Sequence, residues 1–119
     1  MQELERVAQY QAALAFARQQ VSALLKDGRT VLPAHTCGGK WVADPNPASC
    51  GYLAGMLWHF AQSTGDTQWR ADAERCAQAL SEQFNTVRPG ALGLNLLLSH
   101  LPWYELTGDK QVRRILHDA

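Results

Sequence analysis

The amino-acid sequence predicts an all-α fold made of antiparallel helical hairpins. Three observations lead to this prediction: apolar residues recur at helical spacing, strongly apolar segments alternate with amphipathic ones, and the tripeptide Thr-Gly-Asp occurs twice between such segments. A helix that is apolar around most of its circumference has to be covered on all sides, whereas an amphipathic helix keeps one side in water. The alternation therefore predicts inner helices that are enclosed by outer ones, as in hairpins stacked around an axis.

Three segments are amphipathic and are expected to form the outer helices. They are residues 3–26, residues 67–85 and a segment that begins at Lys110. In each of them charged side chains lie away from an apolar stripe, which is the pattern of a helix with one wet side. The apolar stripe of the first segment consists of Leu4, Val7, Leu14, Val21 and Leu25, and Cys76 belongs to the stripe of the second.

Two segments are apolar on most sides and are expected to form buried inner helices. They are residues 49–63, which include Gly51 and Gly55, and residues 92–106. The glycines leave room for a close neighbour. The second of these helices is expected to bend near Pro102, because proline cannot donate a helical hydrogen bond.

The two Thr-Gly-Asp tripeptides are expected to link an inner helix to the outer helix that follows. Gly65 and Gly108 can adopt the left-handed conformation that ends a helix, and Asp66 and Asp109 can cap the next one. The two tripeptides begin 43 residues apart, which is in the range of two-helix repeat units. Capping is the preferred interpretation of these aspartates over a pair of catalytic carboxylates.

Composition limits the class of protein and its partners. The chain of 119 residues has the length of one domain, and its 11 basic and 11 acidic side chains leave no net charge that would favour nucleic acid. The charged N-terminal stretch is unlike a signal peptide, and no apolar run could cross a membrane, so a cytoplasmic chain is expected. The helical pattern after Lys110 stops at Ala119 without a capping signal, which predicts either a truncated gene product or one piece of a larger toroid.

No metal, cofactor or nucleophile is expected. The residues that could hold a metal are His35, Cys37, Cys50 and His59, but their spacing fits no zinc module and His59 falls in a helix predicted to be buried. Three cysteines in a chain without an export signal favour free thiols over disulfides. His100 is interpreted as a core histidine, with a ligand of the central axis as the alternative.

The long connections, residues 27–48 and 86–91, are the parts of the chain expected to contact a ligand. Trp41 could stack on a sugar ring, and Lys40 or Arg88 could pair with a carboxylate. The alternative is structural: Trp41 covers the edge of the core and Arg88 is solvated. The structural alternative is preferred.

The stretch GYLAGMLWHFAQSTGD, followed by ALGL and YELTGD, resembles the N-terminal part of the unsaturated glucuronyl hydrolases, glycoside hydrolase family 88. The resemblance covers most of residues 40–119. It implies a partial (α/α)6 toroid, in which residues 1–119 form a single helical domain of about two and a half hairpins. The residues in register with the family pattern are Gly51, Tyr52, Gly55, Leu57, Trp58, Gly65, Asp66, Gly93 and Asp109.

The resemblance implies a chemistry that this chain lacks the residues to perform. Enzymes of the family use an aspartic acid to hydrate the double bond of an unsaturated uronyl oligosaccharide, after which the glycosidic bond is lost. Here the position of that aspartate is Ala91, and the family's second essential aspartate lies beyond Ala119. No residue is therefore assigned a catalytic role.

Two functions remain open at this stage. The first is a truncated or degenerate relative of these hydrolases that is inactive alone and retains contact with unsaturated uronyl oligosaccharides. The second is a non-catalytic assembly or carbohydrate-binding module that self-associates through open helical edges. A fragment without a selected function is a third possibility. The expected substrate-binding residues are Lys40, Trp41, Tyr52, which adds an aromatic wall at a family position, and Arg88.

Overall fold

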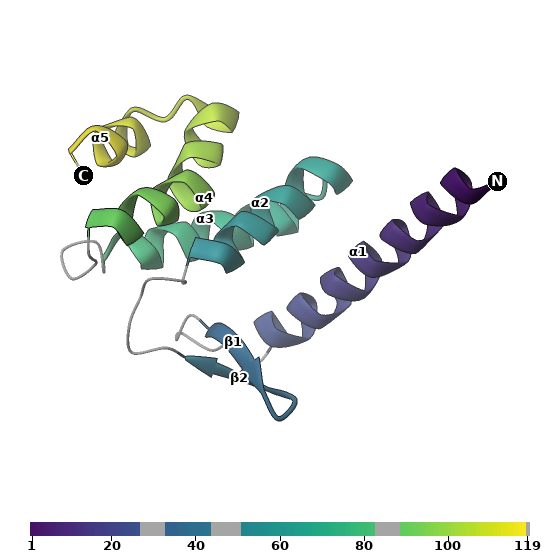
Figure 1. Cartoon of the computed structure of the whole chain (residues 1–119). Coiled ribbons are helices and arrows are strands. Elements are labelled where there is room, and N and C mark those ends of the chain that lie inside the picture. Colours follow the sequence, from purple (N-terminus) through teal and green to yellow (C-terminus); the bar gives the residue numbers. More distant parts are fainter. Residues whose placement is uncertain (27–32, 44–50, 83–88, 119) are drawn as a thin grey trace. The chain divides into compact units, whose positions relative to one another are not determined.

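The computed structural model describes residues 1–26, 33–43, 51–82 and 89–118. The residues of the chain group into two compact units according to which residues contact one another, Met1–Val31 and Leu32–Ala119. Each unit is described by itself (Figure 1). The single domain that the sequence suggests stays a prediction.

The first unit contains helix α1, which spans Gln2–Lys26. Its acidic side chains fall in the first turn and Lys26 in the last, which suits the helix dipole. The first sixteen residues are exposed, and this includes Leu4, Val7 and Leu14 of the predicted apolar stripe. The helix is confirmed, whereas its predicted division into a covered side and a wet side is not seen over these residues.

The second unit begins with a short antiparallel hairpin of β1 (Pro33–Cys37) and β2 (Lys40–Ala43). The strands are joined by Gly38 and Gly39, which have φ values of 56° and 75°. Two successive residues with positive φ are what a tight hairpin turn requires, and glycine adopts them without strain. The hairpin lies within residues 27–48, which are predicted to be a long connection without strands, although a Gly-Gly pair is a known hairpin signal.

Four helices follow: α2 (Gly51–Thr64), α3 (Thr67–Ser81), α4 (Pro89–Thr107) and α5 (Lys110–Asp118). All the predicted helices are therefore found in the described residues, and the all-α class is confirmed apart from the short hairpin. Helix α4 continues through Pro102. No helix of the described part of the chain is both long and apolar enough to span a membrane.

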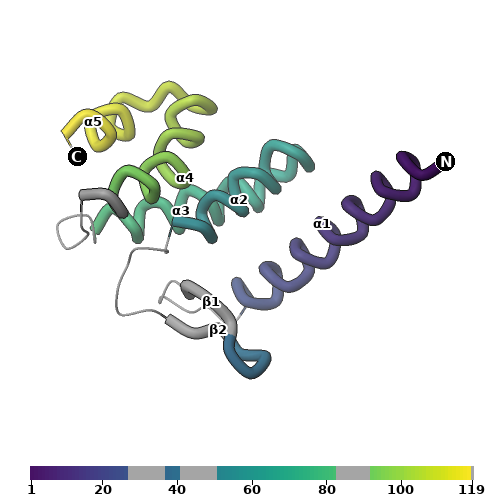
Figure 2. The backbone as a smooth tube through the Cα atoms, viewed as in Figure 1, coloured from purple at the N-terminus to yellow at the C-terminus, as the bar shows by residue number. Residues whose placement is uncertain are grey.

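Helix α2 is the centre of the second unit. It packs against α3 and against α4, and α4 in turn packs against α5 (Figures 1 and 2). The rings of Phe60 and Trp69 join α2 to α3, with centroids 5.1 Å apart. Cys76 is buried, as predicted. The most completely buried apolar side chains described in this unit are Ala54, Leu57, Trp58, Phe60, Ala73, Ala77, Leu80 and Val112.

The two Thr-Gly-Asp turns have the same geometry. Gly65 and Gly108 have φ values of 70° and 65°, in the left-handed region. In both turns the aspartate Oδ1 accepts a hydrogen bond of 2.8 Å from the backbone N–H two residues further on. The threonine hydroxyl also takes part, because it donates to the carbonyl four residues earlier and accepts from the aspartate N–H at 3.2 Å. The predicted capping roles of Asp66 and Asp109 are confirmed.

Candidate functional site

Three of the four residues predicted to bind a sugar lie on two described elements, β2 and α2. Lys40 begins β2 and is exposed, and Trp41 follows it in the same strand, paired with Thr36. Tyr52 is exposed in the first turn of α2. Arg88 lies outside the described residues. The described residues do not test a sugar site at these positions, and their binding role stays a prediction.

Helices α2 and α4 approach each other closely at two glycines of α2, Gly51 and Gly55. The contacts between these helices advance in the same direction along both, so the helices run parallel (Figure 1). In chain order the contacting pairs are Gly51 with Asn95, Gly55 with Leu98, and Trp58 with Trp103.

Gly51 lets α4 approach the first turn of α2. Its N–H donates a hydrogen bond of 3.0 Å to the Oδ1 of Asn95, a side chain that is almost fully buried. The amide therefore satisfies one of the N–H groups that the start of a helix leaves unpaired. A Cβ at Gly51 would lie 2.6 Å from that Oδ1 and 2.8 Å from the Cα of Asn95, so a larger residue does not fit.

Gly55 has a similar but looser role one turn later. A Cβ there would lie 3.2 Å from Cδ2 and 3.3 Å from Cβ of Leu98. This is a tight contact with a side chain, which can shift, and not with backbone. These two glycines of α2 thus serve helix packing.

A buried polar cluster lies on α4, formed by Asn95, Ser99 and His100. Ser99 Oγ lies 2.6 Å from the carbonyl oxygen of Asn95 and 2.8 Å from His100 Nδ1. Burial lowers the pKa of His100 to about 4, because the charged imidazolium loses its solvation, so the ring is neutral at pH 7.

A hydroxyl beside an imidazole is the arrangement of an activated nucleophile. Here, however, Ser99 and His100 are both completely buried, so no substrate can reach the hydroxyl in this structure. The rings of His100 and Trp103 also pack together, with centroids 5.8 Å apart. The core interpretation of His100 is therefore the better one.

The repeat of 43 residues relates positions on α2 to positions on α4. Under this relation Leu94 corresponds to Gly51 and Leu97 to Ala54. The two α2 residues are buried, whereas 39% of Leu94 and 58% of Leu97 is exposed. We call Leu94 and Leu97 the leucine face of α4.

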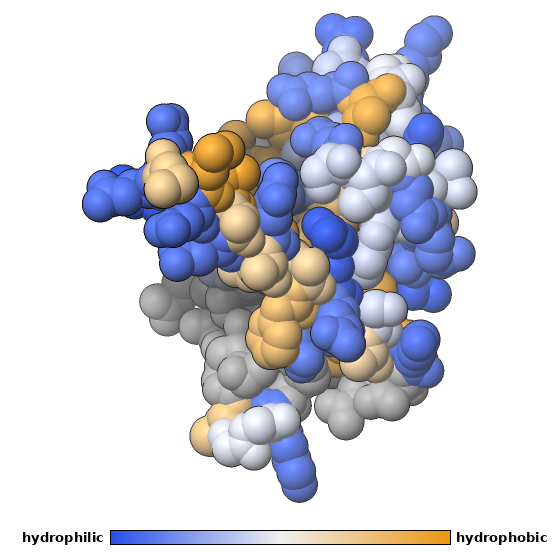
Figure 3. All heavy atoms as spheres, turned by 90° about the vertical axis from the view of Figure 1, so that its right-hand side faces the viewer, coloured by the Kyte–Doolittle hydropathy of each residue, from blue (hydrophilic) through white to orange (hydrophobic). Residues whose placement is uncertain are grey.

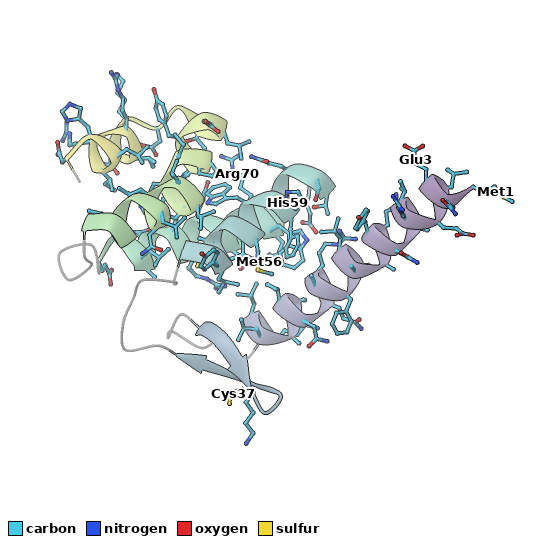
Figure 4. The ribbon with its side chains drawn as sticks, viewed as in Figure 1. Met1, Glu3, Cys37, Met56, His59 and Arg70 are labelled. Carbon is cyan, nitrogen blue, oxygen red and sulfur yellow. The ribbon has the colours of Figure 1, made fainter. Side chains whose placement is uncertain are left out.

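The same relation identifies an uncovered part of α2. Asn95, which is 1% exposed and contacts α2, corresponds to Tyr52, which is 52% exposed. Met56, one turn further, is partly exposed and corresponds to the buried Ser99. We call Tyr52 and Met56 the tyrosine face of α2; Met56 is labelled in Figure 4.

Other candidate residues do not form a site in the described part of the chain. His59 is exposed on α2 (Figure 4), so the prediction that it lies in a buried position was wrong. Cys37 is an exposed free thiol at the end of β1. Among the residues that the structure describes, no three His, Cys, Asp or Glu side chains are placed to hold a metal ion. On the face that Figure 3 presents, apolar side chains lie among polar and charged ones.

Comparisons of the chain with models of protein families, with curated proteins and with solved structures gave no match. Inference about function therefore depends on the packing of the second unit. Sequence reasoning missed the contact between Gly51 and Asn95 and the exposure of Leu94 and Leu97. The 43-residue spacing of the turns aligns the two inner helices position by position and so relates Leu94 to Gly51, but no signal in the sequence indicates the hydrogen bond between Gly51 and Asn95.

Proposed function

We propose that this chain is a non-catalytic helical module that assembles through the open faces of its inner helices. The observation that carries the proposal is the leucine face of α4. Leu94 and Leu97 are exposed at positions where α2, one repeat earlier, is buried. In a stack of repeats, each repeat covers the same face of the repeat before it. A face that is buried in one repeat and exposed in the next therefore marks the place where a further repeat would pack. The leucine face is therefore the place where a further helix would pack.

The two repeats support an arrangement of stacked hairpins, as in an (α/α) toroid. Each consists of an apolar helix, a Thr-Gly-Asp turn of the same geometry and a more polar helix. The two apolar helices run parallel and contact each other through Gly51 and Asn95. Parallel inner helices, each followed by an outer helix, are what stacking around an axis produces.

The degenerate hydrolase relationship is consistent with this scaffold but supplies no chemistry. Gly51, Gly55 and Asp66, which carry much of the resemblance, have packing and capping roles. The position of the family's proton donor is Ala91, in the first turns of α4. A methyl group cannot protonate an alkene.

The test of assembly is the molar mass of the purified chain in solution, measured by light scattering or sedimentation over a hundredfold range of concentration. We expect the mass to rise above that of one chain as concentration increases, because exposed leucines gain by burial. A mass of one chain at every concentration would reject the proposal.

The alternative function, carbohydrate recognition, has one supporting observation, the exposure of Tyr52. An unsaturated glucuronyl disaccharide serves as the probe for both binding and hydrolysis. Calorimetry measures binding, and loss of ultraviolet absorbance of the double bond measures hydrolysis. We expect no loss of absorbance. Heat of binding that disappears in Tyr52→Ala would favour the carbohydrate function.

A further inference from the structure

We infer that the partner of the leucine face is a second copy of the same chain, docked head to tail. The leucine face of α4 in one copy packs on the tyrosine face of α2 in the next. This inference rests on the proposed function and names its partner. It follows from the contact between α2 and α4 that the chain already makes within itself.

The internal contact defines which faces meet. Within one chain, the Gly51 side of α2 meets the Asn95 side of α4. On α4, the position equivalent to Gly51 is occupied by Leu94. On α2, the position equivalent to Asn95 is occupied by Tyr52. The next contact of the same kind therefore joins Leu94 of one copy to Tyr52 of another.

Both faces have the chemistry of a contact between helices. Leu94 and Leu97 are three residues apart and Tyr52 and Met56 four, so each pair lies on one side of its helix. An aromatic ring against leucines buries a large apolar area, and the phenol hydroxyl can stay hydrated at the rim. The chain has as many acidic as basic side chains, so net charge does not oppose association of copies.

The size of the paired side chains also fits a contact between copies. Inside the chain, a glycine faces the buried Asn95, and the helices approach closely enough for a hydrogen bond. Between copies, leucines would face a tyrosine, so the helices stand further apart. Such a contact is governed by burial of apolar side chains and needs no buried polar group.

A symmetric dimer is the main alternative for a second copy. It would place one leucine face against another and leave Tyr52 uncovered. The head-to-tail contact instead uses two different faces, so each copy keeps one free face for another copy. The two arrangements differ in whether Tyr52 takes part.

Two single variants separate these arrangements. Leu97→Asp places a charge on the leucine face and leaves the tyrosine face intact, and Tyr52→Asp does the reverse. We expect each variant alone to have the mass of one chain. An equimolar mixture of the two is expected to form a dimer of one copy each and nothing larger, because only one intact face remains on each copy.

The control is Leu106→Asp, on the same helix. Leu106 is exposed, and at nine residues after Leu97 it lies about half a turn around the helix from it. This variant is expected to associate like the unchanged chain. Circular dichroism of every variant confirms that the helices are retained; a variant that has lost them is replaced by Leu94→Asp or Met56→Asp, which test the same two faces.

The outcomes distinguish failure of the inference from failure of the proposed function. A monomeric unchanged chain would overturn both. Association that persists in Tyr52→Asp, or a mixture that stays monomeric, would overturn the head-to-tail contact alone. Association that persists in both variants would place the contact outside these two faces, and would overturn the proposed function together with the head-to-tail contact.

Discussion

Helices α2 and α4 occupy the same place in two successive repeats, yet their side chains are buried differently. Helix α2 has a glycine where α4 approaches, and it buries the apolar Leu57 in the core. Helix α4 exposes Leu94 at the position of that glycine and buries His100 at the position of Leu57. Burial of a side chain in these repeats is therefore set by the neighbouring element and not by the hydropathy of the helix itself.

The largest effect is expected where α2 and α4 touch. In Gly51→Ala the added Cβ would meet the backbone of Asn95 at 2.8 Å. Because the backbone cannot yield as a side chain does, we expect the free energy of unfolding to fall by about 3 kcal/mol. Denaturant unfolding followed by circular dichroism measures the difference.

The matched control is Gly93 of α4, where an added methyl group would meet no neighbour. A Cβ at Gly93 would have no atom within 4 Å. Alanine has a higher helix propensity than glycine, so Gly93→Ala is expected to stabilise the chain by about 0.5–1 kcal/mol. A similar loss of stability in both variants would contradict the assignment of Gly51 as the contact point.

The second prediction concerns the buried histidine that distinguishes α4 from α2. The pKa of His100 is about 4 in the folded chain, against 6.5 for the unperturbed group. Between these values the unfolded chain binds a proton that the folded chain does not, so stability falls as the pH falls through this window. From pH 7 to pH 5 we expect a loss of roughly 2 kcal/mol, measured as the denaturant midpoint at each pH.

The substitution His100→Gln should remove this pH dependence while it retains a group that can hydrogen-bond to Ser99. The same substitution at the exposed His59 serves as the control and should leave the slope of stability against pH in place. An unchanged slope in His100→Gln would show that another group is responsible. The buried histidine would then not account for a pH dependence that distinguishes α4 from α2.

Sequence reasoning predicted the helices and the Thr-Gly-Asp turns because their signals are local. A left-handed glycine followed by a capping aspartate determines a turn within three residues, so Gly65 and Asp66 could be interpreted without knowledge of the rest. Contacts between distant parts were not predictable in this way. Asn95 bonds to a residue 44 positions away, and nothing near Asn95 in the chain signals it.

The burial of individual helix positions was the least predictable feature. A run of apolar residues predicts an inner helix, but which of its sides is covered depends on how many neighbours are present. Leu97 and His59 were both assigned to buried helices and both are exposed. Tyr52, a candidate binding residue, was likewise placed in a helix expected to be buried, and 52% of it is exposed.

The smallest effect on stability is expected at the two Thr-Gly-Asp turns. Their geometry is the same, but the helices that follow them differ in how many residues they bury. Asp66 caps α3, which has five buried residues, and Asp109 caps α5, which has Val112 as its one buried residue among those described. Removal of the carboxylate in Asp66→Ala is expected to lower the free energy of unfolding by about 1 kcal/mol, because α3 belongs to the core.

In Asp109→Ala the same loss of a hydrogen bond should instead unravel α5 and leave the rest folded, because a nine-residue helix with little burial depends on its cap. Hydrogen exchange distinguishes the two: protection falls throughout the second unit in Asp66→Ala, and only in α5 in Asp109→Ala. Glu105→Ala, which removes an exposed carboxylate within α4, is the control and should change neither. Equal global losses in both turn variants would mean that α5 is part of the same cooperative unit as α2 and α3, and that the two repeats are alike in stability as well as in geometry.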